Sequence, residues 1–187
     1  LDRSLERLAS GFRINHAGDD AAGMAISENL RTQIRGVRQA KRNGMDGVSL
    51  IQVSEGGLNE ISNILVRLRE LSIQSASDTI SDTERQFTDR EFQSLKQEID
   101  RIANVTTFNG TQLLNGQGKS QLELQVGIRS DSHDRIGFNV SENDVRADAL
   151  GISGLKAESI EDARGAIDAV DSALNKVSET RARMGAM

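Results

Sequence analysis

Histidine, cysteine and acidic side chains carry most protein chemistry, and this sequence offers few of them in useful arrangements. It contains two histidines, His16 and His133, and no cysteine. Neither histidine belongs to a His-Glu-x-x-His motif or to another zinc-ligand spacing. Without cysteine the chain has no thiolate ligand and no thiol nucleophile. The sequence therefore predicts no metal site and no cysteine-based catalysis.

The surroundings of His133 are charged, because Asp131, Asp134 and Arg135 lie within two residues of it. A carboxylate beside a histidine can act in general acid–base catalysis. The same composition is typical of a solvated turn, and we interpret this stretch as a turn.

Glycines and acidic residues near the N-terminus could suggest a phosphate-binding loop. Gly11, Gly18 and Gly23 form neither Gly-x-Gly-x-x-Gly nor a loop that ends in Gly-Lys-Ser/Thr. The pair Asp19 and Asp20 fits the start of a helix, where acidic side chains are favourable. Since spacing alone assembles no nucleophile, base and orienting group, we predict no catalytic residues, no cofactor and no enzyme.

Length and charge narrow the class of protein. The 187 residues fit one folding unit, and the net charge of −5 comes from acidic and basic residues interleaved along the chain. This pattern argues against a nucleic-acid partner. No apolar run reaches the roughly 18 residues of a membrane span, and the N-terminus does not begin a signal peptide. The chain does not begin with methionine, so we expect a piece trimmed from a longer protein.

The chain contains no proline, and apolar residues recur at helical spacing from about residue 20 to residue 76, including Ile26, Leu30, Ile34 and Val37. We predict one helix over 20–76, roughly 80 Å long at about 1.5 Å per residue. A bend near Gly44 and Gly47 is possible in this interpretation.

Two further helices are predicted after it. The capping-box pattern from Ser81 to Glu84 opens a helix over 82–105, and the short connection before it makes this helix antiparallel to the first. Ser159 starts a third helix, over 160–186. The apolar residues expected to form an intramolecular seam among the helices are Ile51, Leu58, Ile61, Leu65, Leu68, Phe92, Leu95, Ile99, Ile102, Ile167, Val170, Leu174 and Val177.

Alternating residues between the second and third helices predict a β-hairpin over about 121–140. Leu122, Leu124 and Val126 alternate with polar residues, and Ile136 and Phe138 begin a similar run. We therefore predict a mainly α fold, an elongated antiparallel helical bundle or coiled-coil rod with one β-hairpin packed on it.

Longer stretches of sequence resemble one known family. Residues 5–15, LERLASGFRIN, and residues 17–26, AGDDAAGMAI, strongly resemble the N-terminal signature of bacterial flagellins. The likeness continues at residues 98–102, 108–110 and 124–127, and residues 168–187 resemble the start of the family's C-terminal helical region. The resemblance covers nearly the whole chain.

The chain departs from the family pattern in three ways. Flagellins begin and end with further helical segments that form the innermost tube of the filament, and this chain lacks most of both. Residues 149–152 lead almost directly into the last helix, where many flagellins insert variable outer domains. One group of flagellins carries a zinc-protease motif, which is absent here.

The resemblance implies a structural subunit of the extracellular flagellar filament, which polymerises helically with other flagellin subunits for swimming motility. It also implies export through the flagellar type III pathway without a cleavable signal peptide, and contact with the export and capping machinery. The alternatives are a hook–filament junction protein of the same family, or a non-flagellar coiled-coil adaptor or chaperone.

The resemblance also assigns roles to particular residues. Residues 1–19 would link the core domain, residues 20–187, toward the inner tube, with a hinge at Gly11, Asn15, Gly18, Asp19, Asp20 and Gly23. Three residues match positions at which the vertebrate Toll-like receptor 5 recognises many flagellins, namely Arg67, Leu71 and Glu91.

Overall fold

The structure is a computed structural model that describes residues 2–117 and 121–187. Leu1 of the predicted segment 1–19 and residues 118–120 of the predicted core domain lie outside the described residues. The chain divides into two compact units, residues 1–45 with 124–136, and residues 46–123 with 137–187. In the first unit, the 124–136 segment packs on the first part of the long helix, and the expected boundary after residue 19 stays a prediction. Asn43 donates a hydrogen bond to the Gln125 carbonyl at 2.9 Å. A separate role for residues 1–19 stays a prediction.

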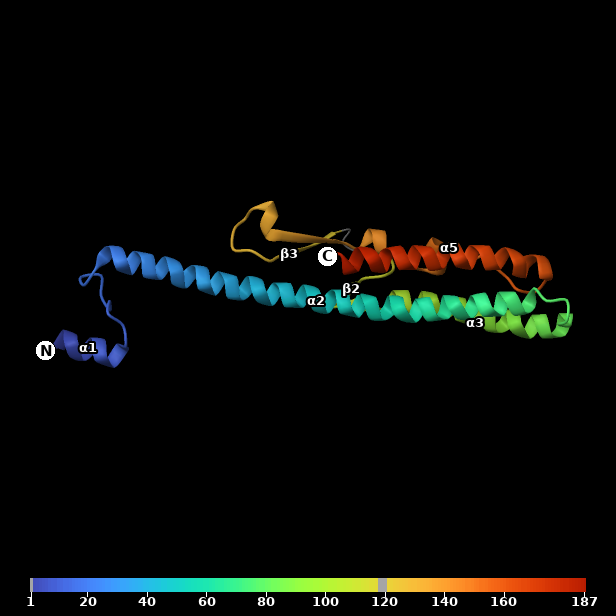
Figure 1. Cartoon of the computed structure of the whole chain (residues 1–187), viewed down its shortest axis with the longest axis horizontal. Coiled ribbons are helices and arrows are strands. Elements are labelled where there is room, and N and C mark those ends of the chain that lie inside the picture. The colour runs from blue at the N-terminus through green and yellow to red at the C-terminus, as the bar shows by residue number, and fades with distance from the viewer. Residues whose placement is uncertain (1, 118–120) are drawn as a thin grey trace. The chain divides into compact units, whose positions relative to one another are not determined.

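The described chain is mainly helical (Figure 1). The α-helices are α1 (Asp2–Ser10), α2 (Ala21–Ser75), α3 (Asp82–Val105), α4 (Ala147–Leu150) and α5 (Ile160–Gly185). The three helices predicted from the sequence differ from α2, α3 and α5 by at most one residue at each end. α2 remains helical through Gly44 and Gly47. No helix among the described residues has both the length and the apolar character needed to cross a membrane.

The predicted caps are present at the starts of α3 and α5. The Ser81 backbone N–H donates to a Glu84 carboxylate oxygen at 2.8 Å, and the Glu84 N–H donates to the Ser81 hydroxyl at 3.4 Å. The hydrogen bonds that the Ser81 backbone N–H and the Ser81 hydroxyl donate to the Glu84 carboxylate lower the pKa of Glu84. At α5, the Ser159 hydroxyl accepts a hydrogen bond from the Asp162 N–H at 3.1 Å. Each cap satisfies an amide that the helix itself leaves unpaired.

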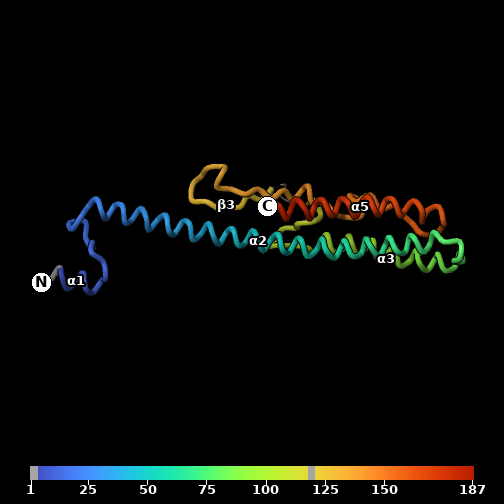
Figure 2. The backbone as a smooth tube through the Cα atoms, viewed as in Figure 1, coloured from blue at the N-terminus to red at the C-terminus, as the bar shows by residue number. Residues whose placement is uncertain are grey.

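Within the second unit, the later part of α2 packs against α3 and α5 (Figure 2). Arg67 of α2 contacts Glu91, while nearer the turn the Arg85 side chain donates to the Ser75 carbonyl at 3.0 Å. Arg67 and Glu91 are 24 residues apart in the sequence, whereas Ser75 and Arg85 are only 10 apart. Because paired residues come closer in sequence toward the turn, α2 and α3 are antiparallel, as predicted. On the other side, Arg69 of α2 pairs with Asp171 of α5 at 2.6 Å.

The predicted seam forms the core of this unit. Eight of its residues are buried, namely Leu58, Ile61, Leu65, Leu68, Phe92, Ile99, Val170 and Val177. Four more are partly buried and pack against them, namely Ile51, Leu95, Ile102 and Leu174. Ile167 is also partly buried, and its place in the seam stays a prediction, while Ala163, Ala166 and Ala173 of the same helix are completely buried. Small side chains let two helices approach closely.

Two small two-stranded sheets lie among the described residues. The first pairs β1 (Thr107–Phe108) antiparallel with β2 (Thr111–Gln112), around Asn109 and Gly110 with φ of 48° and 76°. Such left-handed residues suit a two-residue hairpin turn. Neither strand was predicted from the sequence. The second pairs β3 (Gln121–Gln125) with β4 (Arg135–Asn139), which confirms the predicted hairpin.

A polar cluster on α3 holds the connection between α4 and α5. The Lys96 ammonium donates to the Ser153 carbonyl at 2.6 Å and to the Leu155 carbonyl at 2.8 Å. The Asp89 carboxylate accepts a hydrogen bond from the Ala157 N–H at 2.7 Å. Both Asp89 and Lys96 are buried. Three hydrogen bonds thus fasten an irregular segment to the bundle, and none of them was predicted from the sequence.

Candidate interaction surfaces

An exposed ion-pair cluster joins α2 to α3 at two of the three predicted receptor residues. Arg67 donates to a Glu91 carboxylate oxygen and to a Glu70 carboxylate oxygen, at 2.9 and 3.0 Å. The Arg67 and Glu91 side chains are 47% and 46% exposed. The hydrogen bonds to Glu70 and then Glu91 raise the pKa of Arg67, so its charge is permanent at any physiological pH. The cluster presents a guanidinium held in one place on the surface.

The third predicted receptor residue, Leu71, does not belong to this surface. Its side chain is only 1% exposed and lies in the hydrophobic core with Leu68. Helical spacing puts Leu71 on the same side of α2 as Arg67, but the Leu71 side chain packs into the core whereas the Arg67 side chain is half exposed. Direct contact between the Leu71 side chain and a partner is therefore a wrong prediction.

Arg69 offers a comparison with Arg67 because it lies two residues away on the same helix. It pairs with Asp171 of α5 at 2.6 Å, and its side chain is 42% exposed. The hydrogen bond to Asp171 raises the pKa of Arg69. The two arginines are equally charged and similarly exposed, yet they face different neighbouring helices.

In the first unit, the predicted hinge residues form the folded linker between α1 and α2. The Asp19 carboxylate accepts hydrogen bonds from the N–H groups of Asn15 and His16, both at 3.3 Å. The Asp20 carboxylate accepts one from the Gly23 N–H at 2.9 Å and so caps α2. A β-carbon at Gly23 would lie 2.5 Å from that carboxylate, so a larger residue here would force the Asp20 side chain to move.

The remaining two hinge glycines differ from each other. Gly11 has a φ of 70° and its N–H donates to the Arg7 carbonyl at 3.0 Å, which ends α1. A β-carbon at Gly18 would meet no atom within 4 Å. The linker therefore has the helix cap expected from the sequence, while its hinge role stays a prediction.

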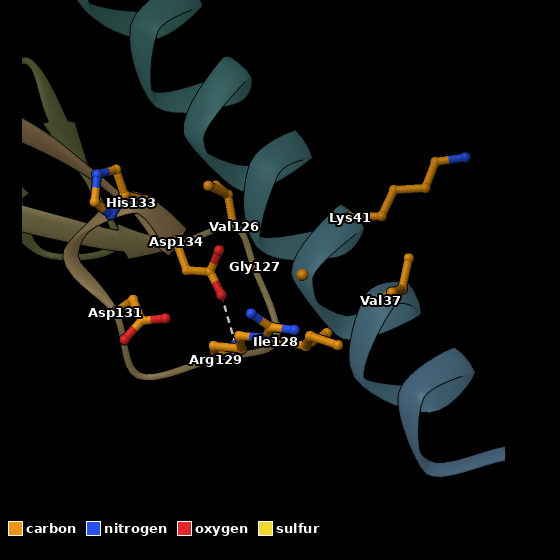
Figure 3. A pocket seen from close by; sticks show the side chains of 10 residues that line it. Val37, Lys41, Val126, Gly127, Ile128, Arg129, Asp131, His133 and Asp134 are labelled. Carbon is orange, nitrogen blue, oxygen red and sulfur yellow. Dashed lines mark hydrogen bonds between the residues drawn. The ribbon is translucent and has the colours of Figure 1, made fainter. Parts of the chain in front are cut away.

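A cavity of about 580 Å³ lies in the first unit, between α2 and the loop that joins β3 to β4 (Figure 3). Asp134 organises this loop, because its carbonyl accepts a hydrogen bond from the Val126 N–H at 2.8 Å and its carboxylate accepts one from the Arg129 N–H at 2.6 Å. Figure 3 shows that carboxylate turned toward Arg129, with the His133 ring lying apart from it. This geometry agrees with a turn rather than a carboxylate–histidine pair.

The early part of α2 carries an exposed apolar stripe. Ile26, Leu30, Ile34 and Val37 have the predicted helical spacing, and each is more than half exposed. Within the part of the chain that the structure describes, no group of three or more His, Cys, Asp or Glu residues could hold a metal ion.

Comparison with known proteins relates these helices to one family. A family model described as the bacterial flagellin N-terminal helical region matches residues 1–119. A flagellin of Halalkalibacterium halodurans is 46% identical over 188 residues, which cover 99% of this chain and 67% of that protein. The chain belongs to the bacterial flagellin family. A flagellar filament core protein of Brachyspira hyodysenteriae is 41% identical to this flagellin over 197 residues, covering 100% of the chain and 69% of that protein.

Solved structures agree with this assignment. The crystal structure of Bacillus cereus flagellin matches with a TM-score of 0.68 and 31% identity, over 78% of this chain and 81% of that one. A putative flagellar hook-associated protein from Vibrio parahaemolyticus matches with a TM-score of 0.71 over 91% of this chain and 88% of its own, but at 16% identity it shows the fold alone. This flagellin is a structural component of the extracellular flagellar filament and polymerises with other flagellin subunits.

Proposed function

We propose that the flagellin subunit contacts its copies in the filament through the polar faces of its helices, while its apolar seam stays inside each subunit. The observation that carries this proposal is the complete burial of Leu58, Leu65 and Phe92 within the second unit. A seam covered by the subunit's own helices cannot also form a coiled coil with a neighbour. Eight amide residues lie along α2, all exposed except the half-buried Asn43, and they are Asn29, Gln33, Gln39, Asn43, Gln52, Asn59, Asn63 and Gln74.

If the seam is internal, the 187-residue chain in solution stays monomeric. Polar contacts contribute only about 1 kcal/mol each, so lateral contacts of this kind are weak between two free subunits. Light scattering of the purified chain checks this expectation. Spontaneous growth of long filaments would contradict it, because an apolar surface, either the seam or the exposed stripe on the early part of α2, would then have to be shared between copies.

The proposal gives the subunit no catalytic step, in keeping with a structural family. It includes passage through the flagellar secretion channel before folding, and contact with the capping machinery at the filament end. The linker capped by Asp19 and Asp20 supports a bend between residues 1–19 and α2. In this proposal that bend leads from the core domain toward the inner tube.

We also propose that Toll-like receptor 5 recognises Arg67 and Glu91. The geometry of the two residues supports this proposal. Both side chains are half exposed, and 2.9 Å separates Arg67 Nη2 on α2 from Glu91 Oε1 on α3. An arginine fixed by a carboxylate loses little conformational entropy when a partner binds, and arginine is common among dominant interface residues. Leu71 would act only by packing beneath Arg67.

Replacing Arg67 by alanine should weaken the response of receptor reporter cells by roughly tenfold or more, since dominant interface residues contribute about 2 kcal/mol or more. Arg69→Ala is the matched control, because it also removes an exposed, ion-paired arginine from α2. The dose that gives half-maximal signal is measured for both variants. Equal responses from the two variants would remove Arg67 from the proposed receptor surface.

A further inference from the structure

Gly56 lies inside α2, and the described residues of its own subunit do not explain it. A β-carbon at Gly56 would meet no atom within 4 Å. The adjacent Gly57 differs, since a β-carbon there would lie 2.8 Å from Leu114 Cδ1 and from Thr106 Oγ1. Glycine is a poor helix former, and alanine would strengthen the helix at an unconstrained position. Gly56 therefore destabilises α2, and no contact among the described residues of the subunit requires a glycine there.

An open groove of about 360 Å³ lies beside Gly56 in the second unit, between α2 and α5. Gln52, Glu55 and Asn59 line it from α2, and Arg181 lines it from α5. Arg181 and Glu55 pair loosely across it, with 3.6 Å between Nη2 and Oε1 and with side chains 37% and 58% exposed. The groove thus exposes helix backbone at its glycine and hydrogen-bonding groups around it.

The charge of this groove suits a second copy of the chain. Each copy has a net charge of −5, so identical subunits repel one another at close range. The groove lining is neutral in sum, with two amides, one carboxylate and one guanidinium. Amides also form hydrogen bonds across an interface without the cost of desolvating a charge. Two acidic copies can therefore meet here without placing like charges together.

We propose that the groove beside Gly56 is a contact between copies in the filament, where a neighbouring copy approaches the bare backbone of α2. A side chain at position 56 would hold the neighbour away. Gly165 of α5 is equally open at its β-carbon position, so the proposal rests on the groove beside Gly56 and its lining rather than on the glycine alone. The proposal rests on the assembly of copies through polar helix faces, and it names one place where that assembly occurs.

Gly56→Ala tests the proposal because it should move two measurements in opposite directions. The substitution is made in the flagellin as the bacterium produces it, so that filaments can form. The melting temperature of the depolymerised subunit should rise by about 2–4 °C, because alanine favours the helix. The concentration of free subunit in equilibrium with filaments should rise by about tenfold, because the methyl group intrudes on a packed contact.

Gly165→Ala is the matched control. Gly165 is also an exposed glycine inside a helix, α5, and a β-carbon there would also meet no atom within 4 Å. This variant should gain stability similarly and leave the concentration of free subunit unchanged. The proposal is overturned if Gly56→Ala assembles as well as Gly165→Ala, or if both variants weaken assembly alike. Light scattering of the 187-residue chain separately tests the proposal that copies contact one another through the polar faces of their helices.

Discussion

Replacing Phe92 by alanine lowers the free energy of unfolding by about 3–5 kcal/mol. Phe92 is completely buried at the centre of the helical unit, among Leu65, Leu68 and Ile99 of the same core. The chain has five phenylalanines and neither tryptophan nor tyrosine, so few other large side chains contribute to its core. The lost contacts and the cavity left behind both destabilise the fold. Urea unfolding followed by circular dichroism measures the change.

Phe87→Ala serves as the control for this prediction. Phe87 lies on the same helix but is 60% exposed, with the Arg90 guanidinium 5.4 Å from its ring centre. Its loss should cost less than about 1 kcal/mol, since only surface contacts and a weak cation–π interaction disappear. A loss as large as that of Phe92→Ala would mean that the bundle packs through a different face of α3.

Lys96→Met lowers the free energy of unfolding by about 2–3 kcal/mol at neutral pH. Methionine matches the length of the lysine stem and removes the desolvation cost of the buried ammonium. It also leaves the carbonyls of Ser153 and Leu155 without their charged donor, and each such hydrogen bond contributes about 1.5–3 kcal/mol. The Lys96 ammonium also donates to the Gln93 side-chain oxygen at 2.9 Å, so the substitution loses three charged hydrogen bonds against one relieved desolvation cost. The measurement is again urea unfolding, with Lys156→Met as the control.

The control and the pH dependence separate this role from a general charge effect. Lys156 is 57% exposed and only 3.5 Å from Glu158, so Lys156→Met should change stability by no more than about 0.5 kcal/mol. Burial lowers the pKa of Lys96 below its usual 10.5. At a pH between the lowered pKa of the folded chain and 10.5, Lys96 holds its proton more fully in the unfolded chain than in the folded chain. This group therefore makes the free energy of unfolding rise with pH in that range. Lys96→Met lacks that rise, and a constant gap from the unmodified chain across the alkaline range would contradict the assignment.

Much of the fold was predictable because its signals are local. The capping box at Ser81, the seven-residue spacing from Leu58 to Leu65 and the absence of proline each act within a few turns of one helix. These features fixed the three long helices and most of the seam. Family signatures in residues 5–26 then pointed to the filament.

The features that were missed depend on partners distant in the sequence. Leu71 is buried in the core of the second unit, although Arg67, four residues before it on the same helix, is half exposed. Lys96 uses backbone carbonyls 57 and 59 residues away, which no spacing of side-chain types can reveal. The groove at Gly56 likewise appears only when the surroundings of each glycine are known.

The antiparallel arrangement of the bundle also sets an order of folding. α2 and α3 meet through residues as few as 10 apart, such as Ser75 and Arg85, whereas Arg69 must find Asp171 across 102 residues. Closing a short loop costs less chain entropy and takes less time than closing a long one. We therefore expect the α2–α3 hairpin to form first and to present a half-built groove into which α5 docks, so that the last helix of the chain completes the subunit.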